Sequence, residues 1–237
     1  MVEDWDKFDE QVKEICSLYQ RACVLERQGI HLISSDELTA IQATERLRPD
    51  LPTQPAQIRR IEFEYKRHGC LSLIASFSVA RGQIINASVG PTRKEVDFVA
   101  HIRNTIETDP QAGWIFIVDQ LNTHQSEGLV RLVSQKCGLT DDLGKKGQKG
   151  ILKSMTTRAA FLSDETHRIR FVYTPKHASW LNQIEIWFSI LVRRLLRRES
   201  FCSVSQLKQR ILAFIDYFNR TMAGPFRWTY KGRPLVA

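Results

Sequence analysis

The sequence predicts an α/β domain in which helices flank both faces of a mixed β-sheet. The chain has 237 residues, 43% of them hydrophobic, which is enough for one compact domain with a substantial core. A group of strand-like runs comes first and alternating helices and strands follow, an order typical of a mixed sheet. An unbroken apolar run over residues 114–118 indicates a central strand that is buried on both faces.

The N-terminal part is expected to begin with a helix. Apolar residues recur at helical spacing over residues 5–27, and Gly29 marks the end of this helix. A short strand is predicted over residues 30–35, with Asp36 at its end. The segment 48–57 contains three prolines, which predicts a loop.

The next segment has the pattern of antiparallel strands. Alternating apolar and polar residues predict two separate strands over 60–67 and 71–80, and a turn then leads into a strand over 83–89. A capping-box pattern over residues 92–95 predicts the start of a helix that continues to about Asp109.

The C-terminal half is predicted to alternate helices with strands. A polar, glycine-rich and basic segment over residues 140–150 interrupts it and is expected to be a mobile loop. The other expected elements are a helix over 125–137, a short helix over 151–162, a strand over 168–174, a long amphipathic helix from Ile184 to Leu195 and a last helix over 205–220.

Composition limits the classes of function. Lys and Arg outnumber Asp and Glu by 34 to 26, which favours a polyanionic partner without requiring one. No apolar run approaches the roughly 18 residues of a membrane span, and the acidic N-terminus is unlike a signal peptide, so we expect a soluble, cytoplasmic protein. The five scattered cysteines form no C-x-x-C pair, which argues against disulfides and a structural zinc site.

Three acidic residues stand at positions that favour metal chemistry. Asp36 and Asp119 follow predicted strands, where ligands of α/β sheets bind, and Glu185 lies on the first turn of a predicted helix. Converging carboxylates repel one another unless cations lie between them, and Mg²⁺ and Mn²⁺ prefer such oxygen ligands. Two such ions can support displacement at a phosphodiester. Alternatively, the aspartates are ordinary turn residues, and Asn182 and Glu185 form a capping box.

Two segments carry a resemblance to a known family. They are Ile-Val-Asp-Gln-Leu-Asn-Thr-His over residues 117–124 and Tyr-Thr-Pro-Lys-His-Ala-Ser-Trp-Leu-Asn-Gln-Ile-Glu-Ile-Trp over residues 173–187. Both closely resemble the last two catalytic blocks of insertion-sequence transposases of the IS630 and Tc1/mariner superfamily. Asp36 and Glu37, with the residues that follow them, resemble the first block, and the resemblance extends from about residue 30 to the C-terminus.

The resemblance implies an RNase H-like fold with a five-stranded mixed sheet and a catalytic domain of the DDE type. Asp36, Asp119 and Glu185 would then hold Mg²⁺ or Mn²⁺, two ions in all. In this class water first cleaves a DNA strand at the element end, and the freed 3′-hydroxyl then attacks target DNA. No side-chain nucleophile is needed, which fits a sequence without a convincing Ser/His or Cys/His arrangement.

Further residues are expected around the acids and along the DNA. The resemblance makes Asn122, His124 and Asn182 contacts of the acidic residues, although His124 could instead steer a phosphate or simply begin a helix. Lys145, Lys146 and Lys149 could equally belong to a solvated loop. The arginines near residue 195 could instead be there because cations are favoured at the C-terminal end of a helix. The expected DNA contacts are Lys145, Lys146, Lys149, His177, Arg193, Arg194, Arg197 and Arg198.

Two features depart from the family pattern. The 65 residues between Asp119 and Glu185 exceed the family's usual spacing, and a basic insertion around residues 140–165 accounts for the excess. Few residues precede the first predicted strand, too few for the DNA-recognition domains of relatives. We therefore expect an N-terminal helix over residues 1–29, as a truncated or linker segment, and an RNase H-like catalytic domain over residues 30–237.

The leading expectation is the catalytic core of a DNA transposase. Its partners would be double-stranded DNA and further copies of itself, and the resemblance implies a bacterial, nucleoid-associated protein. One alternative is a non-catalytic DNA-binding or assembly protein descended from a transposase. Another is an RNase H-like nuclease that acts on RNA or on RNA–DNA hybrids. Intact carboxylates at all three positions argue against the binding-only alternative.

Overall fold

Five strands form one mixed sheet in the computed structural model, which describes residues 5–230 apart from residues 50, 56, 59 and 61. The strands are β1 (Ile30–Arg46), β2 (Tyr65–Ser78), β3 (Gln83–Gly90), β4 (Gly113–Val118) and β5 (Ile169–Tyr173). Their order across the sheet is β3-β2-β1-β4-β5. The first three strands pair antiparallel, whereas β4 runs parallel to β1 and β5 parallel to β4. The predicted mixed five-stranded sheet is confirmed.

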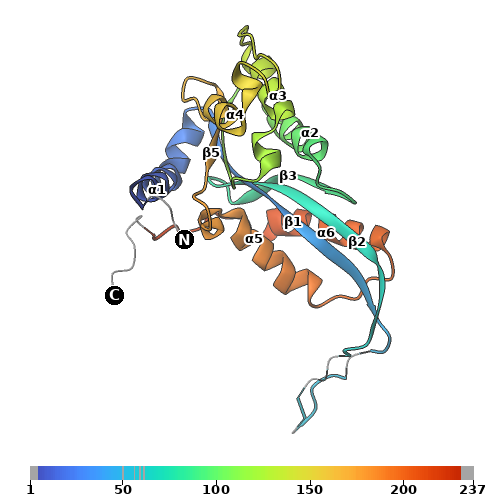
Figure 1. Ribbon diagram of the computed structural model, residues 1–237. Coiled ribbons are helices and arrows are strands. Elements are labelled where there is room, and N and C mark those ends of the chain that lie inside the picture. Colours follow the sequence, from blue (N-terminus) through green and yellow to red (C-terminus); the bar gives the residue numbers. More distant parts are fainter. Residues whose placement is uncertain (1–4, 50, 56, 59, 61, 231–237) are drawn as a thin grey trace.

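Helices cover both faces of this sheet, as predicted (Figure 1). One face is covered by α2 (Glu95–Ile106), α3 (Glu127–Cys137) and α4 (Met155–Leu162). The opposite face is covered by α1 (Trp5–Arg27), α5 (Ile184–Leu191) and α6 (Val204–Thr221). Within the described residues no helix is long and apolar enough to cross a membrane, and all five cysteines are free thiols.

The central strand β4 is buried on both faces, which confirms the prediction from its apolar run. Trp114 and Phe116 pack into the core beneath α2 and α3, and the alternate residues Ile115 and Ile117 pack against α1. Because both faces of β4 are covered, its end is held firmly in place, and Asp119 follows directly after it.

The first strand is much longer than predicted. The expected strand over residues 30–35 was to end at Asp36, but β1 continues to Arg46, and Asp36 lies inside it. The strand is extended because it pairs with β2 along almost its whole length. A bulge interrupts the pairing between Leu38 and Ile41, where Ala40 takes a positive φ of 54°.

The predicted strands over 60–67 and 71–80 are present from residue 65 to residue 78, but as one continuous strand, β2, and not as a pair. Residue 61 lies outside the described residues. Strand β2 begins at Tyr65 and passes through Gly69, whose φ of 110° absorbs a local irregularity opposite β1. Together β1 and β2 form a long hairpin that projects from the body of the molecule (Figure 1).

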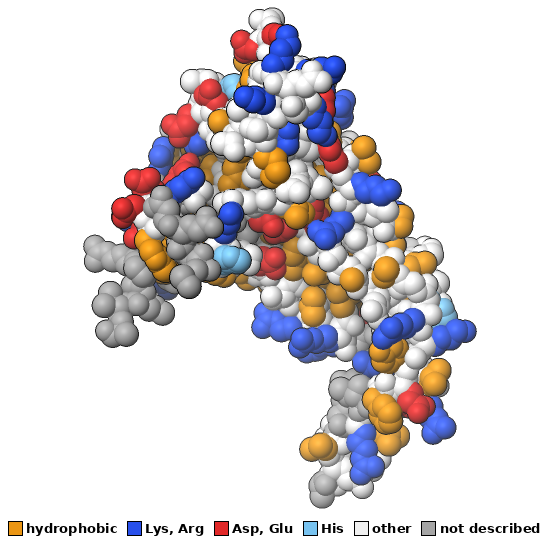
Figure 2. Space-filling model, viewed as in Figure 1, with side chains coloured by type: hydrophobic (Ala, Val, Ile, Leu, Met, Phe, Trp, Pro, Cys, Tyr) orange, Lys and Arg blue, Asp and Glu red, His pale blue; other side chains and the backbone are white. Residues whose placement is uncertain are grey.

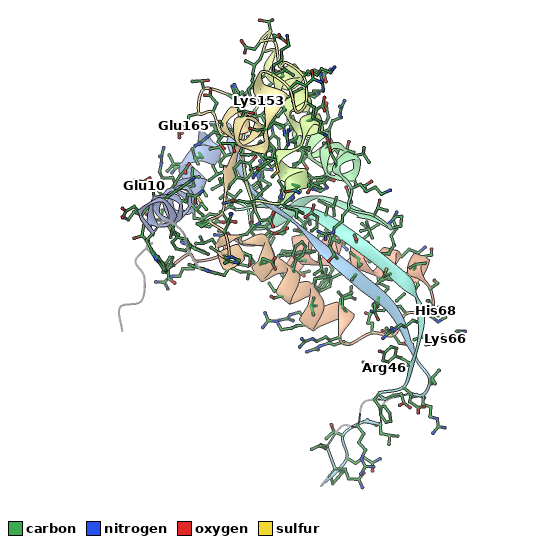
Figure 3. All side chains as sticks on the ribbon, viewed as in Figure 1. Glu10, Arg46, Lys66, His68, Lys153 and Glu165 are labelled. Atoms are coloured by element: carbon green, nitrogen blue, oxygen red, sulfur yellow. The ribbon has the colours of Figure 1, made fainter. Side chains whose placement is uncertain are left out.

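The projecting part of this hairpin exposes large apolar side chains beside charged ones; the exposed apolar residues are Leu47, Leu51, Ile58, Phe63 and Tyr65. Arg46, Lys66 and His68 lie where the hairpin leaves the body (Figure 3). The predicted loop over 48–57 is confirmed in its described residues apart from short antiparallel bridges, which join Leu51 to Arg60 and Gln54 to Gln57.

Helix α2 begins with a different cap from the one predicted over residues 92–95. Asp97 closes it, since its carboxylate accepts hydrogen bonds from the Lys94 backbone N–H at 2.7 Å and from the Thr92 hydroxyl at 2.6 Å. The helix ends at Ile106, three residues before the predicted end, and turns continue to Asp109.

The basic segment over residues 140–150 folds into a compact turn. The Lys145 N–H donates to the Lys149 carbonyl at 3.0 Å, and the Leu152 N–H donates to the Leu143 carbonyl at 2.9 Å. Gly144 is required at this turn, because a Cβ there would lie 2.2 Å from the Lys149 carbonyl oxygen. Backbone hydrogen bonds therefore hold in shape a loop that was expected to be mobile.

The following segment is built into the core. The predicted short helix is present as a 3₁₀ turn, Ile151–Lys153, followed by α4. Leu152 and Leu162 are fully buried, and the Arg158 guanidinium donates to the Gln125 carbonyl at 2.6 Å. The region expected to be an insertion thus covers one face of the sheet.

The long helix predicted from Ile184 to Leu195 changes its winding partway. It is α-helical to Leu191 and continues as a π-helix over Val192–Leu196. The Arg197 N–H closes this wider turn on the Val192 carbonyl at 2.9 Å. Such π-turns recur at functional sites, and this one carries part of the predicted arginine cluster.

Candidate active site

The sheet register places Asp36 and Asp119 side by side. The parallel pairing of β1 with β4 runs as far as Ser34 opposite Ile117. Two residues further along each chain lie Asp36 and Asp119, and a step of two returns each side chain to the same face of the sheet. The sequence predicted this proximity, although Asp36 is in mid-strand and not at a strand end.

Asp36 is a buried carboxylic acid in an unfavourable electrostatic environment. Only 7% of its surface is exposed. Burial, and next the negative charge of Asp119, raise the pKa of Asp36 to about 7. The Glu37 backbone N–H donates to Asp36 Oδ1 at 2.8 Å and the charge of His124 also favours the ionised form, but they do not offset the loss of water. A bound cation would relieve this cost.

The pKa of Asp119 is lowered, unlike that of Asp36, because Asp119 faces His124. The histidine Nδ1 lies 2.7 Å from Asp119 Oδ1, and the Leu121 N–H donates to the same oxygen at 2.9 Å. Burial would raise the pKa of Asp119, but the hydrogen bond and charge of His124 outweigh it and lower this pKa. Asp119 therefore stays ionised near neutral pH.

His124 bridges two carboxylates and has no exposed surface. Its Nε2 lies 3.3 Å from Glu37 Oε1, on the side opposite Asp119. Burial would lower the pKa of His124, but hydrogen bonds to Asp119 and Glu37 raise it to about 10. The expected contact with an acid is present. The alternative role of steering a phosphate does not fit, because solvent cannot reach the ring.

Glu185 lies on the first turn of α5 and shares the electrostatic environment of the aspartates. Burial, and next the charge of Asp119, raise the pKa of Glu185. Across the described residues, however, no three Asp, Glu, His or Cys side chains stand close enough together to enclose one ion. The charge of Asp119 raises the pKa of both Asp36 and Glu185, but the three acids do not enclose one ion in this arrangement.

Asn182 ties the loop before α5 to the strand that carries Asp36. Its Nδ2 donates to Asp36 Oδ2 at 3.2 Å and to the Ser35 carbonyl at 3.1 Å, while its Oδ1 accepts from the Ser34 hydroxyl. The same hydroxyl accepts a hydrogen bond from the Ile184 N–H at 2.8 Å. Asn182 is therefore not the side-chain cap that one alternative assumed; the helix N-cap is Gln183, without a side-chain bond.

A second tie to the same loop comes from α1. The buried Tyr19 hydroxyl donates to the Leu181 carbonyl at 2.6 Å and accepts a hydrogen bond from the Gln183 N–H at 3.3 Å. The N-terminal helix is thus packed against the sheet and fixes the backbone just before Glu185. Sequence reasoning treated this helix only as a truncated or linker segment.

The donor set suits Mg²⁺ or Mn²⁺. Asp36, Asp119 and Glu185 offer only carboxylate oxygens, the ligands that these ions prefer. The raised pKa of Asp36 is an independent sign, because a buried carboxyl pressed against a second negative charge is stabilised by a cation. The side chains that line this region therefore fit divalent ions in their chemistry.

The remaining predicted residues lie at the surface. Asn122 is exposed, and among the described residues its side chain has no hydrogen-bond partner, so it does not contact the acids as expected. Figure 2 shows acidic side chains in the middle of one face, with basic side chains over the far end of the α5 helix. The basic residues predicted to contact DNA are all exposed: Lys145, Lys146, Lys149, His177, Arg193, Arg194, Arg197 and Arg198.

Three contacts of this site were missed from the sequence. Glu37 was noted beside Asp36, but its bond to His124 depends on a contact with a residue far along the chain. Ser34 lies two residues before Asp36, so the period-2 pattern of a strand places it on the same face and could have identified it. Nothing in the local sequence distinguishes Tyr19 from other apolar residues of α1.

Comparison with known proteins identifies the family of this chain. The family model described as DDE superfamily endonuclease matches residues 31–208, most of the chain. The chain therefore belongs to the DDE superfamily endonucleases. No curated protein sequence is significantly similar to it.

Solved structures of Mos1 mariner transposase share the fold. The Mos1 mariner paired end complex with Mn gives a TM-score of 0.54 at 13% identity, covering 91% of this chain and 56% of that chain. The catalytic domain of Mos1 mariner transposase gives 0.52 at 10% identity, covering 89% of this chain and 79% of that chain. The fold is therefore RNase H-like, as the sequence predicted, and this chain spans little more than half the length of the Mos1 chain in the first complex.

Proposed function

We propose that this chain is the catalytic core of a DNA transposase of the IS630 and Tc1/mariner superfamily. It cleaves a DNA strand at the element end and joins the freed 3′-hydroxyl to target DNA. The observation that carries the proposal is the placement of Asp36 beside Asp119, with the start of α5 tied to the same strand. The family match supports it, and so do the Mos1 structures, which include a paired end complex with Mn and a catalytic domain with Mg.

Asp36, Asp119 and Glu185 would hold two Mg²⁺ or Mn²⁺ ions. When bound, such ions activate the attacking oxygen and stabilise the leaving oxygen of a phosphodiester. Asp119 is kept ionised by His124, so it is ready to bind a cation without first losing a proton. Asp36, whose pKa is raised to about 7, would have to be in its ionised form to hold a cation.

The remaining polar residues position these acids and the DNA. Asn182 and Ser34 hold the start of α5 against β1, which sets where Glu185 can reach. The exposed lysines of the 145–149 turn and the arginines beyond α5 bind DNA phosphates, which gives register without base specificity. Homo-oligomers bring two element ends together, by analogy with the paired end complex of Mos1 mariner.

A cleavage assay with matched substrates tests the proposal. End-labelled element-end DNA, single-stranded RNA and an RNA–DNA hybrid of the same sequence are incubated with protein and Mn²⁺. We expect cleavage of DNA that is abolished by Asp36→Asn, Asp119→Asn and Glu185→Gln. The control Glu10→Gln, at an exposed position of α1, should leave cleavage unchanged (Figure 3). Cleavage that survives all three changes would refute the proposal, and cleavage confined to RNA or the hybrid would favour the nuclease.

A further inference from the structure

One exposed tryptophan lies beside the candidate active site. Trp180 is 49% exposed and belongs to the 3₁₀ turn Ser179–Leu181. Two residues later, Asn182 donates a hydrogen bond to Asp36, so the turn is continuous with the site. By contrast Trp187, on the helix that follows, is fully buried in the core. An indole exposed at this position has no role in packing the core.

The exposed indole is held in place by the C-terminal tail. The Tyr230 ring meets Trp180 edge to face, with centroids 5.1 Å apart and ring planes at 81°. The tail is anchored because Trp228 packs on Tyr19 at 4.8 Å and donates its Nε1–H to the Cys16 sulfur at 3.4 Å. A perpendicular contact covers only part of an aromatic side chain, so Trp180 is supported and still accessible.

The turn around Trp180 has the charge that a nucleic-acid strand requires. Lys176 and His177 are exposed in the same connection, and no acidic residue occurs between Thr174 and Asn182. His177 has a positive φ of 62°, which sets the direction of the chain before the tryptophan. A stacking ring beside exposed cations is the combination by which proteins hold single-stranded nucleic acid.

We propose that Trp180 stacks on an unpaired base of the DNA strand whose phosphate lies at Asp36, Asp119 and Glu185. This inference rests on the proposed function and names the feature of DNA that the site recognises. Bases inside a duplex are covered by their neighbours, so only a base freed from pairing near the cut can present a face to the indole. Because every base has such a face, Trp180 favours unpaired DNA ends without selecting their sequence.

The test compares DNA with and without an unpaired end. Binding is measured in chelator, to prevent cleavage, for a fully paired duplex and for the same duplex with three unpaired nucleotides at one end. We expect Trp180→Ala to weaken binding of the unpaired end by about fivefold to 100-fold and to leave binding of the paired duplex unchanged. Trp180→Phe retains most of the preference. The matched control is Trp5→Ala, because Trp5 is also exposed but lies on α1, in a different element from Trp180.

A fluorescent base gives a second readout. 2-Aminopurine at the unpaired position is expected to lose emission on binding wild-type protein and to keep it on binding Trp180→Ala. If Trp180→Ala weakens binding of both duplexes equally, or of neither, the proposal is overturned. It is also overturned if Trp180→Ala abolishes self-association of the protein in the absence of DNA, because Trp180 would then act between protein copies. If the preference is lost as expected but wild-type protein cleaves no DNA, the stacking role stands and the proposed catalysis fails.

Discussion

Replacing Asp36 by asparagine is expected to stabilise the metal-free protein while it removes activity. The folded protein holds Asp36 at a pKa of about 7, compared with its ordinary value of 3.8. Keeping the carboxylate ionised in the folded state therefore costs about 4 kcal/mol above pH 7, at 1.36 kcal/mol for each pKa unit. Asparagine has nearly the same shape, and its amide carries no charge to be desolvated or repelled by Asp119. Its single oxygen keeps one of the two hydrogen bonds, from the Glu37 N–H or from Asn182 Nδ2, and the loss of the other reduces the gain.

The pH dependence of this gain follows from proton linkage. Between pH 3.8 and about pH 7 the folded state binds more protons than the unfolded state, so wild-type stability falls as the pH rises. The advantage of Asp36→Asn is accordingly near zero at pH 3.8, grows through this window and reaches its full value above pH 7. Urea unfolding of both proteins in chelator, at several values of pH across the window, measures the difference in the free energy of unfolding.

The companion variant Asp119→Asn should behave in the opposite way. In the wild-type protein the Asp119 carboxyl has a lowered pKa because it faces His124, so its ionised form stabilises the fold above pH 3.8. Removing that charge lowers the free energy of unfolding near neutral pH and leaves a buried imidazolium with only Glu37. A stability change of the same sign in both variants, or a gain for Asp36→Asn that does not vary with pH, would refute the reasoning.

Three further predictions concern metal, positioning and DNA. Mn²⁺ affinity, measured by calorimetry, should fall about tenfold for each pH unit below pH 7, because Asp36 must release a proton; an affinity independent of pH contradicts this. Tyr19→Phe should cost about 1–3 kcal/mol of stability, because the Leu181 carbonyl loses its donor, and should also slow cleavage; unchanged urea midpoints and rates would exclude the tie. Replacing four arginines by glutamine should reduce the dependence of log K for DNA on log salt by up to about 4, and an unchanged slope would remove these residues from the interface. The four are Arg193, Arg194, Arg197 and Arg198.

Local patterns predicted the parts of the fold that local physics determines. The apolar run of β4 identified a strand covered on both faces, and the acid directly after it was therefore placed correctly. The apolar stripe of α5 likewise gave the helix that carries Glu185. In both cases the pattern of apolar residues within the segment is enough to indicate which side chains are buried.

The errors arose where distant parts of the chain decide the outcome. The end of β1 was placed at Asp36, yet antiparallel pairing with β2 keeps the chain extended as far as Arg46. The same pairing joined two predicted strands into one. The ties from Tyr19 and Ser34 to the loop before α5 span more than 140 residues of sequence. The strand period places Ser34 on the face of Asp36, but no local pattern indicates the distant residues to which Ser34 and Tyr19 bond.

The hydroxyl of Tyr19 also has a consequence for how small the working unit can be. The family match begins at residue 31, after α1 has ended, so a protein trimmed to that boundary would lack the helix. Such a shortened protein could keep its three acids and its sheet, yet the peptide groups on either side of Asn182 would lose their anchor. Displacing α1 would likewise disturb the backbone before Glu185, through the Tyr19 hydroxyl and through the packing of α1 on Ala178 and Leu181.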